Sequence, residues 1–155
     1  MTIKQVIEKF VPELNESEVE KTRRKWSEKY RDYLLLTELN DGVKEILEFL
    51  KDKVKIGAVT NRSQTTVLSH HKIIDFFDSI ITSSDVIKPK PSPEGILKAL
   101  NQLKVKPEQA IFIGDAETDV IAGNSAGVKM LVYQVKLNGD AEKIDSFEEL
   151  KNYLK

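Results

Sequence analysis

The sequence has 155 residues, 40% of them hydrophobic and 32% charged, which is typical of one folded domain of ordinary size rather than of a disordered chain. Its net charge of −1 gives no general attraction to nucleic acid or to a membrane surface, and the lack of cysteine excludes disulfides, thiolate catalysis and zinc–thiolate sites. No apolar run approaches the roughly 20 residues that span a bilayer, and no apolar signal region follows Met1. We therefore expect a cytoplasmic protein with no nucleic-acid or membrane partner.

The N-terminal part of the chain is predicted to form two helices. Apolar residues have helical spacing from position 3 to position 11, and Pro12 ends this first helix. A second, longer helix, capped by Asn15 or Ser17, is expected to run to about Leu36, with an aromatic stripe that packs on one face. Neither helix has a pattern typical of a catalytic site.

Helices and strands alternate from residue 40 onward. Asp41 can cap a helix from Val43 to about Asp52. Strands are then expected over 54–59, 79–82, 110–113 and 128–133, with helices beginning after residue 60, over 93–103, over 117–126 and from about Ser146. This alternation predicts an α/β fold in which helices cover both faces of a parallel sheet.

The first candidate site lies in the stretch from Ala110 to Gly127. A short apolar run ends at Gly114-Asp115, so Asp115 would lie at the carboxyl end of a buried strand, where open parallel sheets bind ligands. Asp119 follows four residues later on the same side of a helix. Two carboxylates in this arrangement suit a hard cation such as Mg²⁺. The alternative is structural: Asp115 caps the helix, and Asp119 interacts with the positive end of its dipole.

Two further loops are predicted at the same edge of the sheet. Thr60-Asn61 follows a strand and precedes a helix, where a hydroxyl and free N–H groups can bind an anion; the alternative is a helix cap by Asn61 or Ser63. The run Lys88-Pro89-Lys90-Pro91 precedes a helix that Ser92 can cap. A lysine on this stiff loop can neutralise a phosphate or keep a carboxylate ionised, and the alternative is an ordinary surface lysine.

A strand-end Thr-Asn, a Lys-Pro-x-Pro loop and a Gly-Asp-x-x-x-Asp-x-x-x-Gly-x-x-x-Gly pattern follow one another in that order. The combination resembles the haloacid dehalogenase-like (HAD) superfamily, and more narrowly its phosphoglycolate-phosphatase-like branch, which carries a helical cap. The resemblance covers about residues 40–155, including a closing segment from Ile144 to Leu150. It implies a Rossmann-like parallel sheet and a phosphatase-type hydrolase that uses Mg²⁺ to hydrolyse phosphomonoesters of small molecules.

The resemblance also implies roles for individual residues. Thr60 would hydrogen-bond the transferring phosphoryl group, with the N–H of Asn61 beside it, and Lys90 would be the lysine of the site. Lys88 also begins a Lys-Pro-x-Pro, so the choice between the two lysines stays open. Asp115 would bind Mg²⁺, and Asp119 would support the metal or its water. Such a site stabilises developing charge with fixed donors and a cation.

One motif of the family is absent from the sequence. The family's nucleophile is the first Asp of an Asp-x-Asp that ends the first strand, and this sequence contains no Asp-x-Asp. Residues 1–39 resemble the end of a helical cap instead, so the chain looks like a truncated member that is impaired or inactive as a hydrolase. The missing strand would be central, between the strands ending at Thr60 and Asp115. Those strands must then pair directly, or another segment or a second copy must fill the gap, because unpaired buried backbone groups are costly. We expect the exposed seam to favour self-association or a rearranged N-terminus.

Two other functions are consistent with parts of the pattern. A non-catalytic module could still bind Mg²⁺ and a phosphorylated ligand, because three of the four motifs are present. A receiver-type signalling domain also places an Asp, a Thr and a Lys at strand ends. Its acids would come before the lysine rather than after it, which disfavours that interpretation here.

Overall fold

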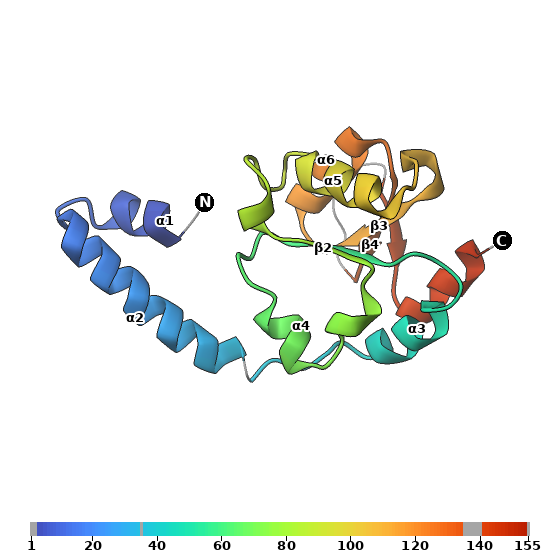
Figure 1. The fold of residues 1–155 in the computed structure, drawn as a ribbon, viewed down its shortest axis with the longest axis horizontal. Helices are drawn as coiled ribbons and strands as arrows, with labels where there is room; N and C mark the ends of the chain where they lie inside the picture. The colour runs from blue at the N-terminus through green and yellow to red at the C-terminus, as the bar shows by residue number, and fades with distance from the viewer. Residues whose placement is uncertain (1–2, 35, 135–140, 155) are drawn as a thin grey trace. The chain divides into compact units, whose positions relative to one another are not determined.

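The computed structural model describes residues 3–34, 36–134 and 141–154. The chain divides into two compact units, Met1–Glu38 and Leu39–Lys155. The first contains two helices, and the second contains every strand of the described residues (Figure 1). None of the helices in these ranges combines the length and the apolar character that crossing a membrane requires.

The N-terminal unit is a pair of packed helices, as predicted. Helices α1 (Ile3–Phe10) and α2 (Glu16–Leu34) contact each other, and among their described side chains Ile7 and Val19 are the buried apolar ones. Asn15 caps α2, because its Oδ1 accepts the N–H of Glu18 at 3.1 Å while the Glu18 carboxylate accepts the N–H of Asn15 at 3.0 Å. The aromatic side chains along α2 are exposed, so the expected packing of that stripe is not seen; they are Trp26, Tyr30 and Tyr33.

All strand pairs among the described residues of the second unit are parallel, which confirms the predicted α/β fold with a parallel sheet. Strand β1 (Gly57–Val59) pairs with β2 (Ser79–Ile81), and β3 (Ile111–Gly114) pairs with β4 (Lys129–Tyr133), which in turn pairs with β5 (Glu142–Ile144). The first four strands lie within the predicted ranges or extend one residue past them. Strand β5 is additional; its sequence, Glu-Lys-Ile, has a single apolar residue and so no strand pattern.

The strands form two separate sheets within the described residues, in the orders β1-β2 and β3-β4-β5. Strands β1 and β3, which were expected either to pair or to leave a gap, do not pair. Each is an edge strand with one partner. The chain therefore has the interrupted sheet that the motif analysis suggested.

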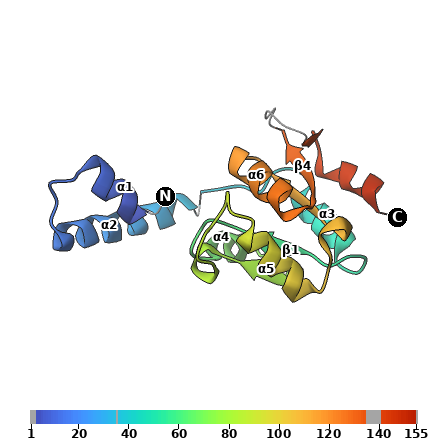
Figure 2. The same ribbon diagram turned by 90° about the horizontal axis from the view of Figure 1, so that it is seen from above.

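Helices cover both faces of these strands (Figures 1 and 2). Helices α5 (Glu94–Leu103) and α6 (Glu117–Ala126) lie on one face, and α3 (Val43–Leu50) and the 3₁₀-helix η4 (Phe147–Tyr153) lie on the other. Strand β4 shows the alternation that this layering requires. Its Met130 and Val132 pack with Val120 of α6, whereas Leu131 and Tyr133 pack with the α3–η4 side.

Several helix starts differ from the prediction. Helix α3 begins after Gly42, whose φ of 79° is left-handed, and not with Asp41 as its cap. The helix expected after residue 60 is α4 (Thr66–His70), which begins later than predicted. The C-terminal helix is a 3₁₀-helix. Three of the loops contain a short 3₁₀ segment: η1 (Ile74–Phe76), η2 (Ser83–Asp85) and η3 (Pro107–Gln109).

Candidate functional site

The loop that carries Lys90 is tied to the end of β1 by Asn61. The N–H of Lys90 donates to Oδ1 of Asn61 at 3.0 Å, and Nδ2 of Asn61 donates to the carbonyl of Lys90 at 2.9 Å. The alternative in which Asn61 or Ser63 caps a helix is wrong, because α4 starts at Thr66 and its N-cap is Thr65. The side-chain role of Asn61 was not predicted, since its partner lies 29 residues away in the chain.

The side chain of Lys90 reaches between the ends of β1 and β3. Its Nζ donates to the carbonyl of Val59 at 3.1 Å and lies 2.6 Å from Oδ1 of Asp119. The side chains of Lys90 and Asp119 are only 12% and 7% exposed, so this ion pair is largely removed from water. Lys88, in contrast, is exposed. Of the two lysines left open by the sequence, Lys90 is the one whose ammonium lies at the strand ends.

Glu94 fixes the same loop from the first turn of α5. Its carboxylate accepts the N–H groups of Ile87 at 2.8 Å and of Lys88 at 2.9 Å, and these two hydrogen bonds lower the pKa of Glu94. The N-cap of α5 is Pro93 rather than the predicted Ser92, although Oγ of Ser92 accepts the N–H of Glu94 at 3.3 Å. No sequence pattern singles out Glu94 beyond its place near a helix start.

Asp119 closes the turn between β3 and α6. Its Oδ2 accepts the N–H groups of Asp115 and Ala116, both at 3.2 Å, and Ala116 is the N-cap residue. The alternative in which Asp115 caps the helix is therefore wrong, because the N-cap is Ala116, whose N–H is accepted by Asp119 at the third helical position. Oδ1 of Asp119 contacts Lys90, and Oδ2 accepts two backbone N–H groups, so each oxygen of the carboxylate has a partner. Its predicted role beside a metal remains a prediction.

Asp115 is exposed at the carboxyl end of β3, and in the described part of the chain its carboxylate has no hydrogen-bond or ion-pair partner. A free carboxylate at this position fits Mg²⁺, which is commonly held by one or two carboxylates, waters and phosphate oxygens of a ligand. Among the same residues no group of three or more His, Asp or Glu side chains could hold a metal by itself. A cation here would depend on Asp115, water and the ligand.

Thr60 lies half-buried at the end of β1. Its N–H pairs with the carbonyl of Ile81 at 2.9 Å, and its Oγ1 accepts the N–H of Arg62 at 3.1 Å. The hydroxyl proton can still be donated to a ligand. Through Val59 and Asp119, Lys90 connects Thr60 at one strand end with Asp115 at the other. A hydroxyl donor, a buried ammonium and an open carboxylate suit a phosphate–cation pair.

Comparison with known proteins identifies the family to which these motifs belong. The family model described as haloacid dehalogenase-like hydrolase matches residues 1–133. Pyrophosphatase PpaX of Bacillus cereus is 35% identical over 133 residues, which are 83% of this chain and 62% of that relative. The chain thus spans less than two thirds of the length of this curated relative.

Two solved structures share the fold over nearly the whole chain. A HAD-superfamily hydrolase, subfamily IA, of Geobacter sulfurreducens has a TM-score of 0.81 at 30% identity, covering 99% of this chain and 73% of that one. A predicted phosphoglycolate phosphatase of Haemophilus somnus also has a TM-score of 0.81, at 22% identity, covering 99% and 74%. The second likeness shows the fold alone. On the family match and the sequence identities, the chain belongs to the haloacid dehalogenase-like hydrolase family.

Proposed function

We propose that residues 39–155 bind a phosphorylated small molecule together with Mg²⁺ at the carboxyl ends of β1 and β3, and that this chain by itself does not hydrolyse the ligand. The observation that carries the proposal is the position of Lys90. Its ammonium lies between the two strand ends, 3.1 Å from the carbonyl of Val59 and 2.6 Å from Asp119, with little exposure to water. The ammonium has three N–H donors, so one remains for a phosphoryl oxygen beside the carbonyl of Val59 and the carboxylate of Asp119. A hydrogen bond with little exposure to water is stronger than one made by a solvated lysine.

Each of the other residues has a chemical part in this proposal. The hydroxyl of Thr60 donates to a phosphoryl oxygen, and the N–H of Asn61 is a second donor beside it. Asp115 would hold Mg²⁺, which when bound neutralises phosphate charge. Asp119 keeps Lys90 in place and keeps the turn before α6 closed. The curated relative is a pyrophosphatase by name, which supports a phosphorylated ligand.

The absence of turnover follows from the carboxylates that the sequence provides. Covalent phosphoryl transfer needs a free carboxylate in line with phosphorus, and the sequence contains no Asp-x-Asp. Asp119 is not free, since Lys90 and two N–H groups occupy both of its oxygens. Asp115 is committed to the cation in this arrangement. A phosphatase that works by itself is the second candidate function, favoured by family membership.

The test is thermal unfolding with inorganic phosphate and MgCl₂, together with hydrolysis of para-nitrophenyl phosphate. We expect phosphate and Mg²⁺ to stabilise the wild-type chain jointly, by about 2.7 kcal/mol when the ligand is at about 100 times its Kd. Asp115→Asn should remove the Mg²⁺ dependence, and Lys90→Met should remove the response to phosphate. Lys88→Met, on an exposed residue of the same loop, is the matched control and should keep both.

The outcomes separate the two candidate functions. Stabilisation without hydrolysis supports a binding module. Mg²⁺-dependent hydrolysis that disappears in Asp115→Asn would overturn the binding-only proposal and show that another group or a water acts as nucleophile. An unchanged melting temperature at saturating phosphate and Mg²⁺ would contradict ligand binding at these strand ends altogether.

A further inference from the structure

The start of α5 lies against the end of β1, and the helix then runs along that strand (Figure 2). A Cβ added at Gly95 would lie 2.9 Å from Cγ1 of Val59, so this close approach of helix and strand requires glycine. The carbonyl of the same Val59 accepts a hydrogen bond from the ammonium of Lys90 at 3.1 Å. The first turn of α5 is therefore placed beside the strand end that holds this ammonium.

Two charged side chains of α5 reach the loop between β2 and α5. The carboxylate of Glu94 accepts the N–H groups of Ile87 at 2.8 Å and of Lys88 at 2.9 Å. One turn further along the helix, Nζ of Lys98 donates to the carbonyl of Asp85 at 2.5 Å. Residues four apart lie on the same side of a helix. One side of α5 thus holds the backbone of this loop at three points.

These contacts are of the strong kind, because the α5 side chains in them are charged. The hydrogen bonds from Ile87 and Lys88, and less strongly the charges of Lys98 and Lys88, lower the pKa of Glu94. Its carboxylate is therefore ionised at neutral pH. Hydrogen bonds with a charged partner are about twice as strong as those between neutral groups.

The two ends of the loop are held from the neighbouring strand ends. Directly after β2, the carboxylate of Asp85 accepts the N–H of Thr82 at 2.8 Å and its hydroxyl at 2.6 Å. At the other end, the side chain of Asn61 bonds both backbone groups of Lys90. Glu94 and Lys98 span the stretch between these two attachments.

This stretch has little apolar packing of its own. The side chain of Ile87 is 90% exposed, and Lys88 and Pro89 are exposed as well. Segments with few buried contacts and solvent-exposed hydrogen bonds open locally at a low cost in free energy. The position of the backbone just ahead of Lys90 therefore depends on its polar contacts, including those from α5.

We propose that Glu94 and Lys98 are positioning residues for Lys90. By fixing the loop they keep the ammonium of Lys90 in place, and they thereby set how tightly it binds a phosphoryl group without touching the ligand themselves. The physical reason is preorganisation, because a loop that is already fixed pays no ordering entropy when the ligand binds. This inference rests on the phosphate site proposed above and adds two residues outside it.

The test is isothermal titration of the purified chain with inorganic phosphate in the presence of MgCl₂. Glu94→Gln keeps one oxygen acceptor but places an NH₂ group against the second N–H. We expect the Kd for phosphate to rise about tenfold in this variant, which corresponds to one lost hydrogen bond to a charged group. Lys98→Met should raise the Kd less, by about threefold, because its bond lies further along the chain from Lys90.

Glu149→Gln is the matched control. Glu149 also accepts two backbone N–H groups ahead of a helical segment, those of Asp145 and Ser146, both at 2.9 Å. It belongs to η4, on the opposite face of the strands from α5. The two glutamine variants should lose similar stability in urea, whereas the phosphate affinity should fall in Glu94→Gln alone. Equal changes in Kd would show an effect of general stability and would overturn the proposal.

A second readout needs no phosphate. The side chain of Lys90 is 12% exposed, so its amine should react slowly with trace formaldehyde and cyanoborohydride, and peptide mass spectrometry locates the methylated lysines. In Glu94→Gln the rate at Lys90 should rise about threefold or more, because the loosened loop exposes the amine more often. In Glu149→Gln it should match the wild type. An unchanged rate in Glu94→Gln would also overturn the proposal.

The outcomes separate this inference from the phosphate site itself. If the wild type binds phosphate and Glu94→Gln binds it equally well, the positioning role is wrong and the phosphate site stands. If the wild type does not bind phosphate, both are wrong. Weaker binding together with faster labelling of Lys90 supports the positioning role. Circular dichroism verifies that the variants are folded, and Lys98→Met, on an exposed side chain, provides both measurements if Glu94→Gln is not.

Discussion

The ammonium of Lys90 lies 2.6 Å from Oδ1 of Asp119, and both side chains are largely buried. The pair joins the loop before α5 to the first turn of α6. Asp119 in turn holds the N–H groups of Asp115 and Ala116, so a single carboxylate links the lysine loop to the candidate metal residue. The geometry of Lys90 and of Asp115 is therefore coupled through Asp119.

Breaking this pair from either side should be costly. Removing one partner leaves a buried charge without compensation, so Lys90→Met and Asp119→Asn should each lower the free energy of unfolding by about 3 kcal/mol or more. The double variant should lose less stability than the sum of the two single losses, and the difference, the coupling free energy, should be about 1–3 kcal/mol. Urea unfolding measures the free energy of unfolding of the two single variants and of the double variant. Lys88→Met should change stability by less than about 0.5 kcal/mol, and strictly additive losses would contradict the coupling.

Asn61→Asp should loosen the Lys90 loop. The substitution removes the amide donor to the carbonyl of Lys90 and places a carboxylate oxygen against it. Because the bonds are exposed, the loss should be about 1–2 kcal/mol. Hydrogen exchange of the Lys90 amide should also become faster. Ser63→Ala, two residues further along the same exposed loop, is the control. Unchanged exchange at Lys90 would show that other contacts hold the loop.

Gly114→Ala should be strongly destabilising. A Cβ at position 114 would lie 2.4 Å from Cβ of Asp119 and 2.6 Å from its Oδ2, so the carboxylate would have to leave the turn. We expect a loss of about 2–3 kcal/mol and a weakened response to phosphate.

Gly123→Ala is the matched control for this substitution. Its added Cβ meets chiefly Sδ of Met130 at 2.8 Å, on a flexible side chain, and alanine favours the helix by about 1 kcal/mol. The net effect should be small. Equal losses in the two variants, measured by chemical unfolding, would mean that the Asp119 turn is not the cause.

The hydroxyl of Tyr153 donates to Glu142, and this hydrogen bond raises the pKa of Tyr153 from its ordinary 10.0 to about 12. The neutral phenol is favoured in the folded chain. The contribution to stability is therefore fully present below pH 10 and is lost as the pH rises through about 12. Difference absorbance between wild type and Tyr153→Phe isolates this titration. In Glu142→Gln the pKa should fall toward 10.0, and a pKa that stays near 12 would exclude Glu142 as the cause.

The sequence by itself determined the fold class and the positions of the candidate site. Strand-end signals at Thr60 and Asp115 and the loop around Lys90 depend on local chemistry, such as β-branched runs, glycine turns and prolines, which a sequence displays directly. The family resemblance was equally local, because its motifs are short and ordered. The same local character explains the errors at Asp41 and Ser92, since residues that are chemically able to cap a helix do not always lie at its start.

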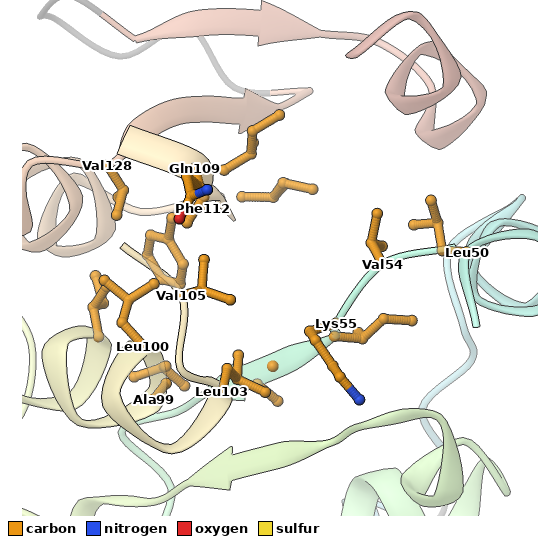
Figure 3. Close-up of a pocket in the computed structure, with 18 of the residues that line it drawn as sticks. Leu50, Val54, Lys55, Ala99, Leu100, Leu103, Val105, Gln109, Phe112 and Val128 are labelled. Carbon is orange, nitrogen blue, oxygen red and sulfur yellow. The ribbon is translucent and has the colours of Figure 1, made fainter. Parts of the chain in front are cut away.

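The tertiary structure decided how these pieces meet. Asn61 and Lys90 lie 29 residues apart, and Lys90 and Asp119 are likewise distant, so no local pattern could reveal that they are paired. The structure also distinguished Lys90 from Lys88 by burial, and Asp115 from Asp119 by which carboxylate is free. The missing motif suggested a gap between β1 and β3, but only the arrangement of all the strands and helices decided that the two strands stay unpaired and which side chains line the space between them (Figure 3).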